Sequence, residues 1–302
     1  MVSLMMKTLS KYNSSLNYIT VIFEAYDFSI KFFKKNTLSF KSRLFHALIR
    51  IIISSVGSTM QLPFFFEENL PVHDEFILSE ESSKHIVQVL RMHEPDQLLI
   101  TNGKGEVLTA FIIVAGKKKT VVKITGRTFF PKHIAKVSIA VSPLKNMNRF
   151  EWFLEKATEI GVSEIIPLIC QRTEKQRLKY DRMKNILVSA ILQSQQAWLP
   201  LLHEPVKFTE IITKFSHQNK FIAHCMEGQK KPLANETSGN YRSDDYRIQQ
   251  GDQLILIGPE GDFTKSEIES ALTNNFIPVS LGETRLRTET AGLVAAVLLL
   301  NK

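Results

Sequence analysis

The chain has 302 residues, of which 44% are hydrophobic, and a formal net charge of +8. This length and apolar content indicate a globular protein of roughly two domains. Two cysteines, Cys170 and Cys225, exclude a disulfide framework and a cysteine metal site, and they favour a reduced, cytoplasmic compartment. No run approaches the roughly 20 apolar residues of a membrane span, so a membrane is not an expected partner. A metal is not expected either, because the two cysteines do not have metal-ligand spacing.

Residues 1–59 differ in composition from the rest of the chain. They contain eight Lys and Arg residues against two acidic residues, and so hold +6 of the net charge of +8. Overall charge is therefore weak support for nucleic-acid binding. We expect residues 1–59 to be a leader unrelated to the fold, or the product of a misassigned start codon, with the folded protein beginning near Met60. A transit peptide or a membrane-surface helix is the alternative.

Residues 60–131 show short, mostly β-type patterns. A helix is predicted from Glu80 to Met92, with Ser79 as its N-cap. Tight turns connect strand-like runs, which indicates a small barrel. The predicted strands are Gln97–Thr101, Val107–Val114 and Thr120–Thr128. Arg91 near the helix end is a candidate phosphate contact, although a C-terminal helix charge is the plainer interpretation.

From Ile134 onward the pattern is α/β, because short apolar strands alternate with amphipathic segments. Strands that are apolar on both faces indicate a parallel sheet. The predicted strands are Val137–Val141, Ile165–Ile169, Phe221–His224, Leu254–Ile257 and Ile277–Leu281. The predicted helices are Asn148–Ile160, Tyr180–Ala197, one starting at Lys265 and an apolar one over Ala291–Leu300. The polar segment Gln229–Asp252 is predicted to be a loop.

Two glycine-containing loops follow the last two strands, at Gly258–Phe263 and Gly282–Ala291. Thr264 and Glu267 form a capping-box pattern after the first loop, and Thr288 is a candidate cap for the last helix. Ligands of parallel sheets bind at the carboxyl ends of strands, so these loops predict a cofactor site. Neither a Walker A loop nor the dinucleotide fingerprint is present, and ordinary strand-to-helix turns are the alternative.

Several basic side chains are predicted at or beyond strand ends, where together they would form a phosphate-binding rim. Singly, each is as well explained as a solvated charge. They are Lys145, Arg149, Arg172, Lys175 and Arg177.

Five segments carry a resemblance to a known family. They are His85–Arg91, Lys156–Val162, Gln193-Ser194, Ile257–Gly261 and Leu281–Ala291. With these segments in this order, the chain from about Met60 resembles the bacterial 16S ribosomal RNA uridine-N3 methyltransferases of the RsmE type, in the SPOUT (trefoil-knot) superfamily.

The resemblance implies a PUA/OB-like RNA-binding barrel at 60–131 and a knotted, parallel-sheet α/β domain at 134–302. It also implies a homodimer, S-adenosylmethionine as cofactor, and 16S ribosomal RNA of the small ribosomal subunit as substrate. The donor-binding residues it indicates are Gly258, Pro259, Glu260, Gly261, Leu281, Gly282, Leu286 and Thr290. His224, after a strand end, is a further candidate for the same cavity, with a purely structural histidine as the alternative. The candidate RNA-binding residues, chosen for their positions at helix and strand ends, are Arg91, Lys145, Arg149 and Arg172.

Uridine N3 carries a proton at neutral pH, so its methylation requires a base or a cation that stabilises the uridine anion. Glu289 is the candidate base, and Arg287 and Arg172 are candidate cations. The alternative is that Glu289 caps its helix and pairs with Arg287.

The chain departs from the family pattern at four places. They are Cys170–Thr173, Gln196, Pro95 and Asp262. The first two lie where RNA contacts are expected. Methylation of another RNA and a non-catalytic RNA-binding role are the alternative functions; a NAD-binding enzyme is disfavoured because its fingerprint is missing.

Overall fold

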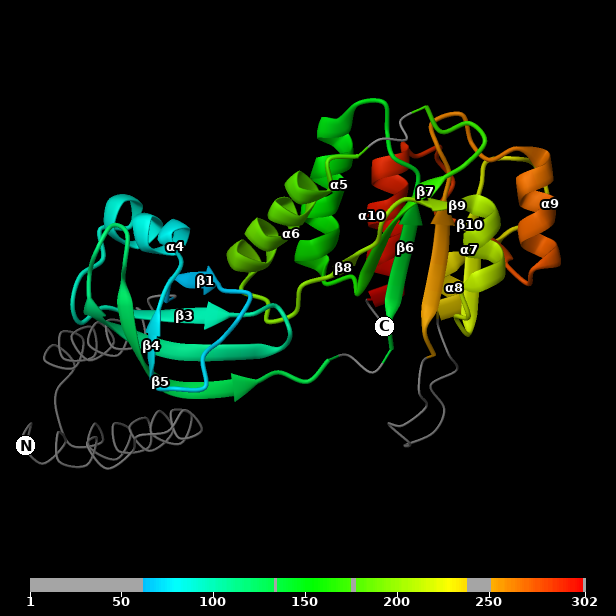
Figure 1. Ribbon diagram of the computed structural model, residues 1–302. Coiled ribbons are helices and arrows are strands. Elements are labelled where there is room, and N and C mark those ends of the chain that lie inside the picture. The colour runs from blue at the N-terminus through cyan, green and yellow to red at the C-terminus, as the bar shows by residue number, and fades with distance from the viewer. Residues whose placement is uncertain (1–61, 133–134, 175–177, 238–250, 301–302) are drawn as a thin grey trace, which may run out of the picture. The chain divides into compact units, whose positions relative to one another are not determined.

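The computed structural model describes residues 62–132, 135–174, 178–237 and 251–300 (Figure 1). The leader predicted at 1–59 lies outside these residues, as do Lys175 and Arg177. Within the described ranges, no helix is both long and apolar enough to cross a membrane.

The N-terminal domain is built on a five-stranded sheet of order β1-β3-β4-β5-β2. Its neighbours pair antiparallel except for β1 and β3, which run parallel. The strands are β1 (Phe64–Phe66), β2 (Glu75–Ile77), β3 (Gln97–Thr101), β4 (Glu106–Val114) and β5 (Val121–Phe129). The three strands predicted here are confirmed to within one residue at each end.

The helix predicted over Glu80–Met92 is shorter and less regular than expected. It consists of α4 (Glu80–Lys84) and a π-helical turn, η1 (His85–Val89). Ser79 is confirmed as the N-cap, because its hydroxyl accepts a hydrogen bond from the Ser82 backbone N–H at 3.3 Å. Ile86 is fully buried against the inner face of the sheet, and this packing holds the turn although its regular helical pattern stops.

The C-terminal domain contains an eight-stranded sheet whose strand pairs are parallel. The order is β11-β13-β10-β12-β6-β7-β8, with β9 also paired to β7. The strands are β6 (Val137–Val141), β7 (Glu164–Ile169), β8 (Leu201–Leu202), β9 (Val206–Lys207), β10 (Asn219–Ala223), β11 (Lys231–Pro232), β12 (Gln253–Ile257) and β13 (Ile277–Ser280). The prediction of a parallel α/β sheet is confirmed.

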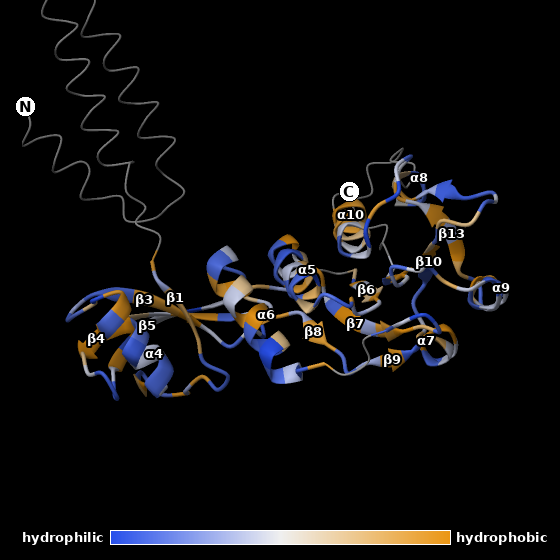
Figure 2. Ribbon diagram, turned by 90° about the horizontal axis from the view of Figure 1, so that it is seen from above, coloured by the Kyte–Doolittle hydropathy of each residue, from blue (hydrophilic) through white to orange (hydrophobic). Residues whose placement is uncertain are grey.

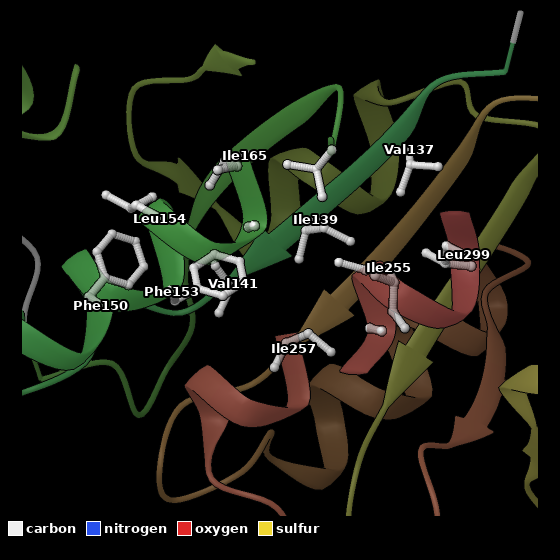
Figure 3. Close-up of a cluster of buried hydrophobic side chains, with 14 of the residues drawn as sticks. Val137, Ile139, Val141, Phe150, Phe153, Leu154, Ile165, Ile255, Ile257 and Leu299 are labelled. Carbon is white, nitrogen blue, oxygen red and sulfur yellow. The ribbon is translucent and has the colours of Figure 1, made fainter. Parts of the chain in front are cut away.

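Helices cover both faces of this sheet (Figure 1), as expected for strands that are buried on both sides. The helices are α5 (Met147–Ile160), α6 (Tyr180–Ser194), α7 (Phe208–Lys214), α8 (Leu233–Thr237), α9 (Lys265–Thr273) and α10 (Thr288–Leu300). On one face, α5 and α10 pack on alternate residues of the central strands; Figure 3 shows Ile139, Ile255 and Phe153 in this core. The other face is covered by α7 and α9.

Two predicted boundaries in this domain are wrong. The segment Gln229–Asp252 is not entirely loop, because it contains β11 and α8; α8 buries Leu233 in the core beside α10. The helix predicted to end at Ala197 ends at Ser194. Gln195 has a left-handed backbone (φ 53°), and the Gln196 amide donates to the carbonyls of Thr158 and Glu159 at the end of α5. Gln196, one of the departures from the family pattern, therefore serves to bind the end of α5.

Candidate functional site

A cavity of about 390 Å³ lies where β10 and β12 end. Its wall is formed by the residues that end these strands, by the loop after β12 and by the segment that leads into α10. The lining residues are Arg149, Ala223, Cys225, Ile257, Gly258, Pro259, Glu260, Asp262, Arg285, Leu286, Arg287, Thr288 and Ala291. The cavity thus lies at the carboxyl ends of parallel strands, where the sequence predicts a cofactor site.

The loop after β12 is tightly folded. A Cβ atom at Gly258 would lie 3.0 Å from the buried ring of Phe263, so the close packing favours glycine. Asp262 has a left-handed backbone (φ 62°), which Asp adopts more readily than most residues. Its carboxylate accepts hydrogen bonds from the backbone N–H of Phe263 and of Cys225, both at 2.8 Å. Asp262 therefore ties the loop after β12 to the end of β10.

Thr288 connects the two glycine-containing loops. It was predicted to cap the last helix, but it is the first residue of α10, and its hydroxyl donates to the Gly258 carbonyl at 3.1 Å. This buried bond fixes the start of α10 against the loop after β12. The segment Arg285–Thr288 is thereby placed along the cavity.

Arg172 supports the same loop from the outside. Its guanidinium donates to the Gly261 carbonyl at 2.6 Å. The predicted capping box is also confirmed: the Thr264 hydroxyl accepts from the Glu267 backbone N–H, while the Glu267 carboxylate accepts from the Thr264 backbone N–H. The other Glu267 oxygen accepts from the Gln171 N–H at 2.8 Å. The segment Cys170–Thr173, a second departure from the family pattern, thus braces the loop.

Arg149 lies between two carboxylates at the cavity wall. It is placed there by the first turn of α5, and its guanidinium lies 3.6 Å from Glu260 Oε1 and 3.8 Å from Glu289 Oε1. Glu289 is only 6% exposed, and its Oε2 has no hydrogen-bond partner in the part of the chain that the structure describes. A buried carboxylate oxygen without a partner is costly, which is a feature of functional sites.

The structure brings only some of the predicted site residues to the cavity. Those that line it are Arg149, Gly258, Pro259, Glu260, Leu286 and Arg287. Glu289, Thr290, Gly261, Leu281 and Gly282 lie next to lining residues or in the same loops but do not line it. Arg149, predicted to contact RNA, is held by the two carboxylates, and the predicted Glu289–Arg287 ion pair is not among the described interactions.

Three other predicted residues do not line the cavity, although His224 lies between the lining residues Ala223 and Cys225. Arg91 belongs to the N-terminal domain and has a left-handed backbone (φ 53°). Lys145 is exposed and pairs with Glu174 at 3.2 Å. His224 follows β10, and its Nδ1 is buried without a partner among the described residues. Burial, together with Lys230, lowers the pKa of His224 and so favours the neutral ring.

Seven lining residues were not among the predicted site residues: Ala223, Cys225, Ile257, Asp262, Arg285, Thr288 and Ala291. Asp262 and Arg285 stand in the two loops themselves, and Cys225 follows the strand that ends beside them. Thr288 was assigned a capping role. The position of Cys225 just after a predicted strand could have indicated that it lines the site. No signal in the sequence indicates the hydrogen bond from Thr288 to Gly258.

Among the described residues, no group of three or more His, Cys, Asp or Glu side chains is arranged to hold a metal ion. The chemistry of the cavity comes instead from carboxylates and guanidinium groups. Of the arginines, Arg285 and Arg287 have no ion pair within the described ranges and so remain available to an anionic partner.

Comparisons with known proteins match both domains. Residues 131–300 match the RNA methyltransferase domain family, and residues 78–125 match the RNA methyltransferase PUA domain family. Ribosomal RNA small subunit methyltransferase E of Bacillus subtilis (strain 168) is 28% identical over 228 residues, which cover 73% of this chain and 87% of the relative. The corresponding protein of Rickettsia conorii is 26% identical and covers 76% and 91%.

Two solved structures are similar over most of their length. A probable rRNA-methyltransferase from Porphyromonas gingivalis has a TM-score of 0.69 and 37% identity, covering 78% of this chain and 95% of that one. Ribosomal RNA small subunit methyltransferase E from Neisseria gonorrhoeae, bound to S-adenosyl methionine, has a TM-score of 0.66 and 27% identity, covering 80% and 97%.

Proposed function

The chain belongs to the RNA methyltransferase family, and from this premise we propose that it transfers a methyl group from S-adenosylmethionine to N3 of a uridine in 16S ribosomal RNA. The observation that carries the proposal is the cavity at the ends of β10 and β12. Its location is the one that ligands of parallel sheets occupy, and its walls come from the two loops that the resemblance assigns to the donor.

The cavity has the size and lining that a donor of this kind requires. Its volume of about 390 Å³ lies within the range of small-molecule sites. Ile257, Leu286 and Ala291 offer an apolar wall for a flat base, while Glu260 and Asp262 offer carboxylates to a cationic ligand. When bound, S-adenosylmethionine supplies a methyl group already activated on a sulfonium.

The side chains of the protein then have to position the uridine and remove its N3 proton. Glu289 is the base we propose, because its Oε2 is free of protein partners among the described residues and its Oε1 is oriented by Arg149. Arg287 is the cation we propose for the uridine anion. Arg172 is proposed to act indirectly, by holding the loop after β12 through its hydrogen bond to Gly261.

We place the enzyme on the small ribosomal subunit of the cytoplasm as a homodimer. The dimer is supported by α10, which is apolar over most of its length (Figure 2). Its inner side packs into the core, whereas Leu293 and Val294 remain half-buried and Val297 is 36% exposed. A partner subunit on this side would cover them.

The first test is calorimetric titration of S-adenosylmethionine into the protein, beside the variant Ala291→Phe. Ala291 lies on α10 and lines the cavity, so a phenyl ring there would fill space that the donor needs. We expect the wild type to bind and the variant to lose binding while retaining cooperative thermal unfolding. Leu272→Phe is the matched control, because Leu272 is exposed on α9 and lies outside the lining.

The second test is methyl transfer to isolated small subunits, with the modified nucleotide identified by mass spectrometry. A methyl group on N3 of one 16S uridine supports the proposal. Methylation of transfer RNA instead would show that the proposed substrate is wrong and that the enzyme acts on another RNA. A folded wild type that binds no donor would contradict the enzyme assignment and leave a non-catalytic RNA-binding protein.

A further inference from the structure

Three aromatic side chains gather outside the cavity, where β5 ends beside the segment that follows α6. Phe129 is 66% exposed and Phe130 is 47% exposed. The Trp198 ring meets the Phe129 ring edge to face, with 6.1 Å between centroids and 82° between planes. The Trp198 indole N–H donates to the Phe130 carbonyl at 2.9 Å. We call Phe129, Phe130 and Trp198 the aromatic platform.

Trp198 and the backbone of the platform are held in place from behind. Trp198 lies against Gly105, where an added Cβ would come within 2.5 Å of the indole ring and the backbone has φ +92°. Backbone hydrogen bonds join Gly105 to Ala197 at 2.9 Å and Phe130 to Gly105 at 2.8 Å. Exposed aromatic side chains that are already ordered lose little conformational entropy when a ligand binds. The core clusters of the described residues do not include any of the three rings.

Two lysines flank the platform and carry its charge. Lys132 Nζ lies 5.3 Å from the Trp198 ring centroid, a cation–π distance. Lys104 forms a β-bridge with Trp198. Neither lysine has a carboxylate partner in the described ranges, whereas the neighbouring Arg127 and Glu106 neutralise each other at 3.1 Å. The surface is thus aromatic and positively charged.

We propose that the aromatic platform binds unpaired nucleotides of the RNA substrate, with bases stacked on Phe129 and Phe130 and phosphates contacted by Lys104 and Lys132. Flat, exposed rings beside cations are the features that recognise single-stranded nucleic acid, because every base presents a π-face and every linkage a negative charge. A protein partner fits less well, since lysine is depleted at protein interfaces. The inference rests on the proposed RNA substrate, but not on the donor site.

The test is the affinity of the full chain for a fluorescein-labelled, single-stranded RNA of 16S sequence, measured by fluorescence anisotropy. The double variant F129A/F130A is expected to raise Kd by at least roughly 5- to 100-fold, the range for loss of a single stacked base. F129L/F130L keeps apolar area but removes both rings, and should weaken binding similarly. K104A/K132A should lower the salt dependence of binding by about one to two units of slope.

Matched controls separate this proposal from the proposed function. V114A removes an exposed apolar side chain elsewhere on the same domain (Val114, 49% exposed) and should leave Kd unchanged. All variants should bind S-adenosylmethionine as the wild type does. Wild-type affinity for RNA in F129A/F130A would overturn the platform and leave the methyltransferase intact. Wild-type affinity in F129L/F130L alone would overturn stacking in favour of a general apolar contact. A wild type that binds no single-stranded RNA would overturn the platform, and methyl transfer to isolated small subunits would still decide the proposed function.

Discussion

Glu289 is the residue whose chemistry the proposed reaction depends on most. Glu289→Gln keeps the shape of the side chain but removes its capacity to accept a proton. A general base contributes about 10²- to 10⁴-fold, so we expect kcat to fall at least about 100-fold. The donor Kd should change little, because Glu289 does not line the cavity. Single-turnover methyl transfer measures the first quantity and calorimetry the second.

The control for Glu289 is Glu283→Gln, an exposed residue of the same loop that does not line the cavity. This variant should retain wild-type kcat. If Glu289→Gln methylates at the wild-type rate, another group removes the proton. If it loses donor binding in parallel with kcat, Glu289 serves mainly to hold Arg149 in the cavity wall.

Glu164 belongs to a second group of charged side chains, at the amino ends of β6 and β7 and thus at the edge of the sheet away from the cavity. Its carboxylate accepts from Lys136 Nζ at 3.1 Å and from the Ser138 hydroxyl at 2.7 Å, and His203 Nε2 lies 3.7 Å away. Burial opposes ionisation of Glu164, but the neighbouring His203, Ser138 and Lys136 side chains outweigh it and lower its pKa to about 2. Burial also lowers the pKa of His217, whose Nε2 lies 3.0 Å from the Ser138 hydroxyl.

Both shifts predict loss of stability in acid. The unfolded chain binds protons more readily at each site, so stability present above the unfolded pKa is lost as pH falls. For His217 the loss begins below about pH 6.5, and for Glu164 it runs from about pH 5 towards pH 2. Glu164→Gln should lower the free energy of unfolding by about 1–3 kcal/mol at pH 7 and flatten the lower part of the curve. Urea denaturation from pH 3 to 7 measures this.

The exposed Glu204 supplies the control for this stability measurement. Glu204→Gln should follow the wild-type pH dependence throughout. An unchanged acid slope in Glu164→Gln would show that other carboxylates carry the acid sensitivity.

At the scale of single residues, the sequence identified loop positions better than it identified partners. Gly258 and Glu260, predicted to bind the donor, line the cavity, because glycine and charge next to a buried strand are visible in the sequence. Arg172 was predicted to act on RNA, yet it donates to Gly261, 89 residues away along the chain. Such a bond depends on tertiary geometry, which local patterns do not encode.

At the scale of elements, the contact between α5 and α10 decides where Arg149 and Glu289 meet. The two helices approach closely because Gly292 has no side chain. An added Cβ would lie 2.7 Å from Cε2 of Phe153, which is fully buried. The two helices therefore pack at a distance that only glycine permits at this position.

Gly292→Ala should therefore destabilise the protein despite the better helix propensity of alanine. Overpacking costs about 1–3 kcal/mol, and propensity returns up to about 1 kcal/mol. We expect a net loss of about 1–2 kcal/mol by chemical denaturation. Adding Phe153→Leu should recover part of the loss, because it makes room for the methyl group. A Gly292→Ala protein as stable as the wild type would mean that α10 can shift freely against α5.

Elements with strong local signals were predicted well, and those fixed by packing were not. The strand Val137–Val141 and the capping box at Thr264 are confirmed as predicted. The π-helical turn His85–Val89 was missed, because a helical pattern does not distinguish the two hydrogen-bonding schemes. The short β11 and α8 were missed because their segment is polar and its pattern is weak.

At the scale of the whole molecule, the two-domain α/β organisation followed from patterns and resemblance, but the strand order did not. Neighbours such as β10 and β12 are separated in the chain by a polar segment, and no periodicity reveals which strands pair. The knot that the resemblance implies stays a prediction, since threading is a global property and knots are rare exceptions to normal topology.

The proposed homodimer predicts how one charged side chain on α10 should act. Helix α10 carries almost no polar residue after Glu289, although only one side of it packs into the core of its own chain. Its other side is therefore also apolar. Val297→Asp places a carboxylate on the outward side, where burial against a second subunit would leave it unpaired and cost several kcal/mol. Light scattering should show a wild-type dimer and a monomeric variant. Leu272→Asp, on the exposed face of α9, should remain dimeric.

The activity of the Val297→Asp monomer then separates two arrangements of the RNA site. If two chains build the RNA site together, the monomer should bind S-adenosylmethionine but transfer no methyl group, because the residues proposed for the donor belong to one chain. A monomer with wild-type methyl transfer would confine catalysis to one subunit and reduce α10 to a stabilising contact. A wild-type protein that is already monomeric would contradict the proposed homodimer. The exposed Val297 would then be an ordinary apolar side chain on the surface, which is common.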